Sequence, residues 1–191
     1  MNVGKVVKQQ LKQNKQMKFV DTRFALGITS SGLIQRWTPP SQGTTTYTRV
    51  ADQICVEKIE VRFVCEYGDA IGNPIRAVLM QTTGGFIPAT LANLFNWGGT
   101  GSEDVTSDYL PYIRGKQIRV LWDSLFSVVP NANTALKCEH LVLKPKLKMI
   151  DFTPGSTTCT NGDLFWVFIS DSAAIPHPAV NIVTRVYFTD P

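Results

Sequence analysis

The feature that most constrains the fold is a two-residue alternation of apolar and charged side chains, which is clearest in residues 54–67. Successive side chains of a β-strand point to opposite faces, so this pattern predicts a half-buried strand. The expected inner face carries Cys55, Ile59, Val61, Phe63, Cys65 and Tyr67, and the expected outer face carries Lys58, Glu60, Arg62 and Glu66.

The same pattern recurs along the chain. Residues 139–149 would place Leu141, Leu143, Leu147 and Met149 inward and Lys144, Lys146 and Lys148 outward, and residues 116–129 and 180–189 alternate less strictly. Residues 164–169 are apolar on both faces, which is typical of a central strand or of one covered by a neighbouring subunit. Turn clusters rich in Gly, Pro and Asn separate these runs, and one short helix is expected over 89–96. The pattern predicts an all-β chain in which some eight strands of residues 24–191 form a single sandwich or jelly-roll domain.

The N-terminal residues differ in composition from the rest. Residues 1–23 contain six basic side chains against Asp21 alone, whereas the rest of the chain carries 13 basic and 14 acidic groups. On a helical wheel Lys5, Lys8, Lys12 and Lys15 share one side, which predicts a short amphipathic basic helix. Such a helix is marginal in water and would become ordered against a polyanionic partner. The alternative is a frayed, solvated arm with incidental lysines.

Catalytic, metal-binding and membrane functions find little support. The two histidines, His140 and His177, fall in separate segments, and no nucleophile elbow, phosphate loop or dinucleotide fingerprint is present. Four cysteines are too sparse for a disulfide scaffold, and no apolar run is long enough to insert into a membrane. We expect no enzyme, metal or cofactor. Among the tryptophans, Trp122 and Trp166 are expected in the core, and Trp37 and Trp97 on the surface as anchors of subunit contacts.

Several segments, taken in order, resemble one family of proteins. Arg49-Val50-Ala51-Asp52-Gln53-Ile54, followed by 58–62, resembles the segment that leads into the first sandwich strand of small icosahedral coat proteins, although Ala51 replaces the usual Gly. These are the coat proteins of satellite tobacco necrosis virus and of Rep-encoding circular single-stranded DNA viruses. Segments 76–81 with 88–96, 117–123, 161–171 and 185–190 are similar to later strands of the family, and the arm is similar to the satellite virus's basic helix.

The resemblance implies a single eight-stranded jelly-roll sandwich that serves as a capsid protein of the virion. Sixty copies would self-assemble into a T=1 icosahedral shell with the arms inside. The arm would hold a single-stranded genome through sequence-independent phosphate contacts. The candidate residues for these contacts are Lys5, Lys8, Lys12, Lys15, Lys18 and Arg23. Circular single-stranded DNA is favoured and RNA comes second. The arm itself does not discriminate between them, because phosphate contacts do not distinguish the sugar. The other class of function is a non-viral jelly-roll binding module, such as a lectin or a cytokine-like oligomer. The sequence identifies no host receptor.

The resemblance also bears on metal ions. The family often places divalent cations at subunit contacts, and Asp190 would be the single candidate ligand.

The charge of the arm covers only part of a genome. About five net arm charges on each of sixty copies neutralise roughly 300 phosphates, which is fewer than a genome of about a thousand nucleotides carries. Counterions, residues upstream of Met1 or further lysines facing inward would supply the rest. Lys144, Lys146 and Lys148 could do so, or could equally lie on a solvated outer face.

Overall fold

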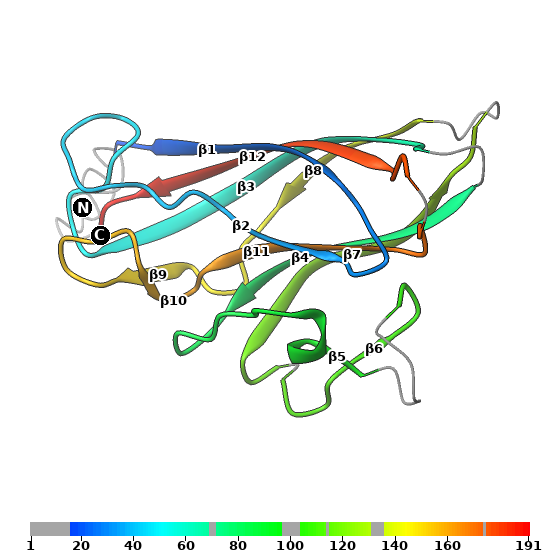
Figure 1. The fold of residues 1–191 in the computed structure, drawn as a ribbon. Coiled ribbons are helices and arrows are strands. Elements are labelled where there is room, and N and C mark those ends of the chain that lie inside the picture. The colour runs from blue at the N-terminus through cyan, green and yellow to red at the C-terminus, as the bar shows by residue number, and fades with distance from the viewer. Residues whose placement is uncertain (1–15, 69–71, 97–103, 114, 131–135, 174) are drawn as a thin grey trace, which may run out of the picture.

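The computed structural model describes residues 16–68, 72–96, 104–113, 115–130, 136–173 and 175–191 (Figure 1). Within these ranges two antiparallel sheets pack face to face as a sandwich. Sheet A contains β1 (Lys18–Gly27), β12 (Ala179–Thr189), β3 (Gln53–Glu66), β8 (Leu136–Leu143), β9 (Met149–Phe152) and β10 (Cys159–Asn161). Sheet B contains β2 (Leu33–Arg36), β11 (Leu164–Ser170), β4 (Asn73–Thr82) and β7 (Ile118–Val128). The described residues thus form more strands than the eight predicted, because short strands accompany the long ones.

Strand order in the two sheets follows from how the chain pairs. In sheet A, β12 lies between β1 and β3, and β8 and β9 both pair with the far edge of β3. In sheet B, β11 lies between β2 and β4, and β4 pairs with β7. Every pair is antiparallel. The segment around Arg49 precedes β3, which follows β1 and β2, so it does not lead into the first strand as predicted.

The predicted inner face of β3 needs one correction. The register with β12 shifts between Tyr187 and Phe188, which pair with Lys58 and Val56, so Glu57 is left as a β-bulge. The extra residue reverses the alternation, and Ile54 and Val56 point into the core while Cys55 points outward. Tyr67 lies beyond the end of the strand and is exposed. The predicted inner positions 59–65 are confirmed.

Aromatic side chains fill the space between the sheets. Trp166 stacks on Phe168 with ring centroids 5.5 Å apart and meets the edge of Trp122 at 6.0 Å. Phe63 of β3 packs against Trp122 at 5.6 Å. Trp166 is buried and Trp122 packs on the core while partly exposed, which confirms the prediction for both.

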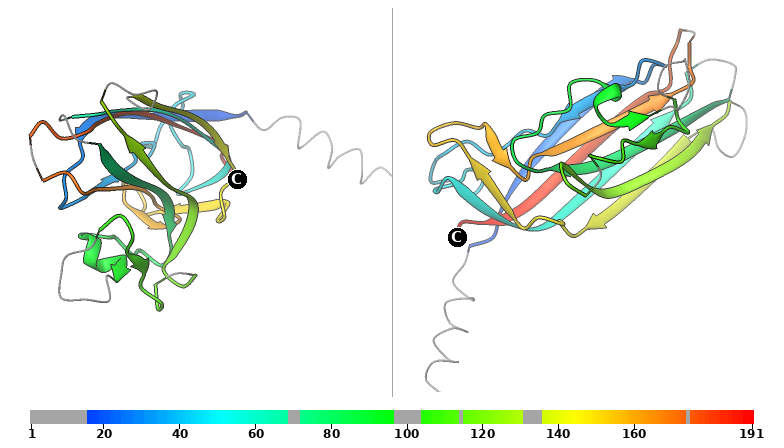
Figure 2. Two further views of the ribbon diagram at one scale, coloured as in Figure 1. Left: turned by 90° about the vertical axis from the view of Figure 1, so that its right-hand side faces the viewer. Right: turned by 90° about the horizontal axis from the view of Figure 1, so that it is seen from below.

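A second apolar cluster lies on the outer side of sheet B. The described residues between 83 and 118 (83–96, 104–113 and 115–118) pack against that side, and they include the 3-10 turn η1 (Leu91–Asn93) and the strands β5 (Phe95–Asn96) and β6 (Asp108–Tyr109) (Figure 2). Leu94, Phe95 and Ile113 cover Phe165 and Val167 of β11 there. The strand that is apolar on both faces is therefore central and covered by its own chain.

Two predicted elements are shorter than expected. Instead of a helix over 89–96, a single 3-10 turn forms, because the Asn93 side chain accepts the amides of Ala89 and Thr90 and closes the turn. The described ranges contain no α-helix, and no helix long and apolar enough to span a membrane is found in them.

The predicted strand over 139–149 is split into β8 and β9. Pro145 lacks the amide that pairing needs, and the buried side chain of Gln81 supplies the bonds instead. Its Oε1 accepts the amides of Lys146 (2.8 Å) and Leu147 (2.9 Å), and its Nε2 donates to the Leu147 carbonyl (3.0 Å). Lys144, Lys146 and Lys148 are exposed, as the alternation predicts.

Candidate nucleic-acid interface

The predicted phosphate-binding residues fall into two groups. Lys5, Lys8, Lys12 and Lys15 lie outside the described residues. Lys18 and Arg23 lie in β1, which begins at Lys18, so both belong to the sandwich although the predicted arm extended to residue 23. Their positions differ by an odd number of residues and their side chains therefore point to opposite faces of the strand.

Lys18 joins the beginning of β1 to the end of the chain. Its side chain is only 7% exposed, and its Nζ lies 2.7 Å from Asp190 Oδ2 and donates to the Thr48 carbonyl at 3.0 Å. Asp190 also accepts the amide of Val50 at 2.9 Å. Burial opposes ionisation of Asp190, but the hydrogen bonds from Lys18 and from Val50, together with the Lys18 charge, outweigh it and lower its pKa.

The charges of these two residues are thus matched within the subunit. Lys18 serves as an anchor of the strand, and Asp190, the candidate cation ligand, accepts bonds from protein donors instead. In the part of the chain that the structure describes, no group of three or more His, Cys, Asp or Glu side chains is placed to hold a metal ion.

Arg23 lies on the outer face of sheet A, defined as the side chains of that sheet that point away from sheet B. Strand register arranges this face in cross-strand rows, because directly paired residues lie side by side. One row contains Asp21, Arg185, Glu60 and Val142; the next contains Arg23, Val183, Arg62 and His140; the third contains Ala25, Asn181, Val64 and Cys138.

Most of the charges near Arg23 are paired with one another. Arg185 donates two hydrogen bonds to Asp21, at 2.7 and 2.8 Å, and these bonds are the main reason why the pKa of Asp21 is lowered and that of Arg185 raised. Lys58 and Glu60 form a 2.7 Å ion pair. Arg23 is 73% exposed and lies 3.9 Å from Asp21, whose oxygens Arg185 already binds. Arg23 therefore presents its charge to solvent.

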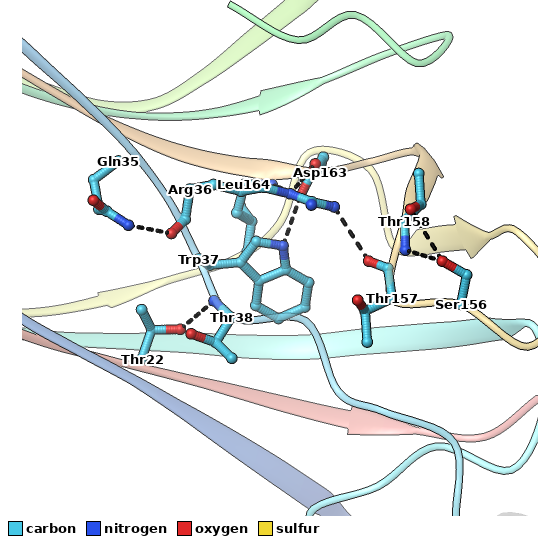
Figure 3. Close-up of polar contacts among 10 residues, drawn as sticks. All are labelled: Thr22, Gln35, Arg36, Trp37, Thr38, Ser156, Thr157, Thr158, Asp163 and Leu164. Carbon is cyan, nitrogen blue, oxygen red and sulfur yellow. Dashed lines mark hydrogen bonds and ion pairs between the residues drawn. The ribbon is translucent and has the colours of Figure 1, made fainter.

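A polar cluster on the other sheet explains a tryptophan that the sequence placed wrongly. Trp37 was expected on the surface but is 3% exposed, and its indole Nε1 donates to Asp163 Oδ1 at 2.7 Å (Figure 3). Arg36 Nε donates to Asp163 Oδ2 at 2.6 Å and Arg36 also reaches the Thr157 carbonyl at 3.2 Å. Burial raises the pKa of Asp163, against the opposing charge of Arg36 and the bond from Trp37. The cluster fixes β2 to the turn before β11.

Arg49, in the segment that resembles the coat proteins, is completely buried. Its guanidinium lies 4.3 Å from the centre of the Phe152 ring, and it donates to Asp52 Oδ1 (3.0 Å), to the Ser156 carbonyl (2.5 Å) and to the Ala51 carbonyl. These contacts tie the loop before β3 to the β9–β10 turn. The spacing of Arg49 and Asp52 thus has a structural cause, which the sequence pattern alone did not reveal.

The sequence misses Arg62, Arg185 and His140 as companions of Arg23. Alternation in 54–67 and 180–189 places Arg62 and Arg185 on an outer face, but which strands lie beside each other is decided by long-range pairing. Arg62 comes from β3, Arg185 from β12 and His140 from β8, and only the register brings them together.

Comparison with known proteins gives similarity of structure at low sequence identity. No family model matches the sequence, and no curated protein matches it. A solved chain from Desmodium yellow mottle tymovirus is 12% identical, with 93% of this chain and 90% of that chain covered and a TM-score of 0.39. One from Sacbrood virus of honeybee is 10% identical, with 93% and 76% covered and a TM-score of 0.39. Both similar structures come from viruses, and the overlap of the backbones is partial.

Proposed function

We propose that this chain is a viral capsid protein that assembles into a small icosahedral shell of sixty copies. The shell would enclose a single-stranded genome, held by sequence-independent contacts between arm lysines and phosphates. Circular single-stranded DNA is the favoured genome. The protein would act as a structural component of the virion and not as an enzyme.

The fold that supports this proposal is a jelly roll, which we infer from the strand pairing. The eight main strands form four nested antiparallel pairs: β1 with β12, β2 with β11, β3 with β8 and β4 with β7. Such nesting is what a long hairpin produces when it is wrapped into two facing sheets. Jelly rolls occur in viral capsids, lectins and cupins, so the fold narrows the function without deciding it.

The observation that carries the proposal is the attachment of a cationic segment to an edge strand of a nearly neutral sandwich. Lys5, Lys8, Lys12 and Lys15 precede β1 directly, and the ion pair of Lys18 with Asp190 fixes the point where the sandwich begins. A lectin or a cytokine-like module has no need of such a segment. A coat protein needs it because every copy must neutralise part of the genome.

The test is negative-stain microscopy of the purified full chain, with absorbance at 260 and 280 nm recorded on the same fraction. Uniform closed particles with excess absorbance at 260 nm are expected. Changing Lys5, Lys8, Lys12 and Lys15 together to Gln should yield shells, or shell subunits, that contain much less nucleic acid. A separate variant changes the exposed Lys144, Lys146 and Lys148 to Gln, which removes a similar charge and decides whether these lysines also neutralise phosphates. The control is Lys116→Gln, at an exposed position before β7. Small oligomers of the wild-type chain that lack nucleic acid at low salt would instead favour the binding module.

A further inference from the structure

We propose that the row Arg23–Val183–Arg62–His140 on the outer face of sheet A is a second binding surface for single-stranded nucleic acid, separate from the arm. The inference rests on the proposed function, since it needs a polyanion enclosed with the protein. Arg23 and Arg62 would bind phosphates, and the adjoining row of Ala25, Asn181, Val64 and Cys138 would receive the sugar and base.

The two arginines form one site because of strand register. Val183 pairs with Arg23 on one side and with Arg62 on the other, so the arginines are two strand spacings apart, about 10 Å. His140 continues the row, since it pairs with Arg62. Two arginines that span the neighbouring strands β1, β12 and β3 can contact more than one phosphate of a nucleic-acid strand that crosses the sheet.

Both arginines have charge to offer to a ligand. The side chain of Arg62 is exposed and makes no hydrogen bond or ion pair with the described residues. Arg23 has only the 3.9 Å contact with Asp21. The adjacent row differs, because Arg185 and Asp21 satisfy each other. A guanidinium can bind a phosphate through two parallel hydrogen bonds, which suits arginine to this role.

A hollow lies beside the cations. It has a volume of about 880 Å³ and is lined by side chains of both rows, including Arg23, Arg62, Val64 and His140. The small side chains of the third row leave this space, and its apolar walls suit the sugar and base of a nucleotide. The imidazole of His140 adds a ring on which a base can stack.

A polyanion fits this face better than a second copy of the chain does. An apolar hollow could pack against protein, but that contact would bury Arg23 and Arg62, and a buried arginine without a carboxylate partner is costly. Asp21 and Glu60, the acidic residues in the row beside the arginines, already have cationic partners of their own, and Glu66 lies in a separate row beyond the third. Nucleic acid would bring the missing negative charge, and the arm, which leads into the same strand as Arg23, would direct it there.

The experiment measures binding of a fluorescent 30-nucleotide oligo-dT to dissociated full-length subunits as salt is varied. For single strands the slope of log K against log salt changes by about 0.7 per phosphate contact. The Arg23→Gln/Arg62→Gln double variant should reduce the slope by about 1.4, and Arg62→Lys should keep most of the Arg62 contribution. Lys116→Gln, at an exposed position before β7 of sheet B, is the control and should leave the slope unchanged. Ultraviolet crosslinking of the wild-type protein should label peptides of β3, β8 or β12.

The outcomes separate this inference from the proposed function. If the double variant keeps the wild-type salt slope while the variant with Lys5, Lys8, Lys12 and Lys15 changed to Gln has a reduced slope, the inference is overturned and the capsid proposal stands. If the double variant impairs particle formation without changing the slope, the face is a contact between subunits, which also overturns the inference. If the wild-type chain binds no oligonucleotide at low salt, both proposals fail.

Discussion

Two buried tryptophans allow us to measure how much the charge of a hydrogen-bond acceptor, here the carboxylate of Asp163, contributes to stability. Trp37 and Trp166 are both almost completely buried, and each indole N–H donates one hydrogen bond. Trp37 donates to Asp163 at 2.7 Å, whereas Trp166 donates to the Thr184 hydroxyl at 2.9 Å. Replacing either tryptophan by Phe removes the donor and leaves a similar gap in the packing. The difference in the free energy of unfolding between the two variants therefore measures the effect of the acceptor's charge.

The expected magnitudes differ by the charge. A hydrogen bond to a charged group contributes about 1.5–3 kcal/mol and a neutral one about 0.5–1.5 kcal/mol. The smaller ring adds roughly 1 kcal/mol of lost packing in each case. Trp37→Phe should therefore lower the free energy of unfolding by about 3 kcal/mol, or Tm by roughly 6–12 °C, and Trp166→Phe by about 2 kcal/mol.

The dependence on pH provides the sharper test. Loss of the Trp37 bond removes one of the contacts that oppose the burial-raised pKa of Asp163, so this pKa rises further in Trp37→Phe. Folded Trp37→Phe then binds a proton more readily than the folded wild type. The difference in the free energy of unfolding between the two proteins should therefore be largest above both folded pKa values of Asp163 and should decrease as pH falls through them. Trp166→Phe should differ from the wild type by the same free energy of unfolding at every pH. Urea unfolding of dissociated subunits between pH 4 and pH 8 measures the pH dependence for both variants. If the two variants lose the same stability at every pH, the reasoning is refuted.

Two further predictions concern buried groups elsewhere. Gln81→Leu should destabilise the chain by about 2–3 kcal/mol, because two amides and a carbonyl of the β8–β9 loop lose their partner. Hydrogen exchange of those two amides should become faster. Unchanged exchange there would contradict the assignment. Burial raises the pKa of Cys65 and of Cys159 to about 12. Native protein at pH 8 should therefore react with a thiol reagent first at the exposed Cys138, which peptide mapping would show. Early labelling of the two buried thiols would contradict this prediction.

Sequence reasoning succeeded where local alternation decides the outcome. The inward positions from Ile59 to Cys65 and the burial of residues 164–169 on both faces follow from period and apolarity, and they were predicted correctly. It failed where one residue depends on a distant partner. The bulge at Glu57 reversed the face of Cys55, and Trp37 is buried because the carboxylate of Asp163 lies beside it after folding. A Trp-Thr-Pro-Pro sequence contains no sign of that carboxylate.

The candidate site shows the same division. Arg23 and Lys18 were both selected because they lie in a charged N-terminal segment, although Lys18 pairs with Asp190. Arg62 and His140 come from strands far apart in sequence, and their adjacency depends on the pairing of β3 with β8. Charge along the chain can indicate a polyanionic partner, but the path of that partner over the surface requires the sheet order.

The residues 83–96, 104–113 and 115–118, which cover sheet B, have a consequence for the order of events in the proposed assembly. Because the chain itself buries both faces of β11, a subunit completes its apolar clusters without a neighbour. Folding should then be a first-order process whose rate does not depend on protein concentration, and association should follow as a separate, concentration-dependent stage between preformed bodies. If the chain assembles as proposed, folded and unassembled subunits should accordingly persist at high dilution and form particles when concentrated.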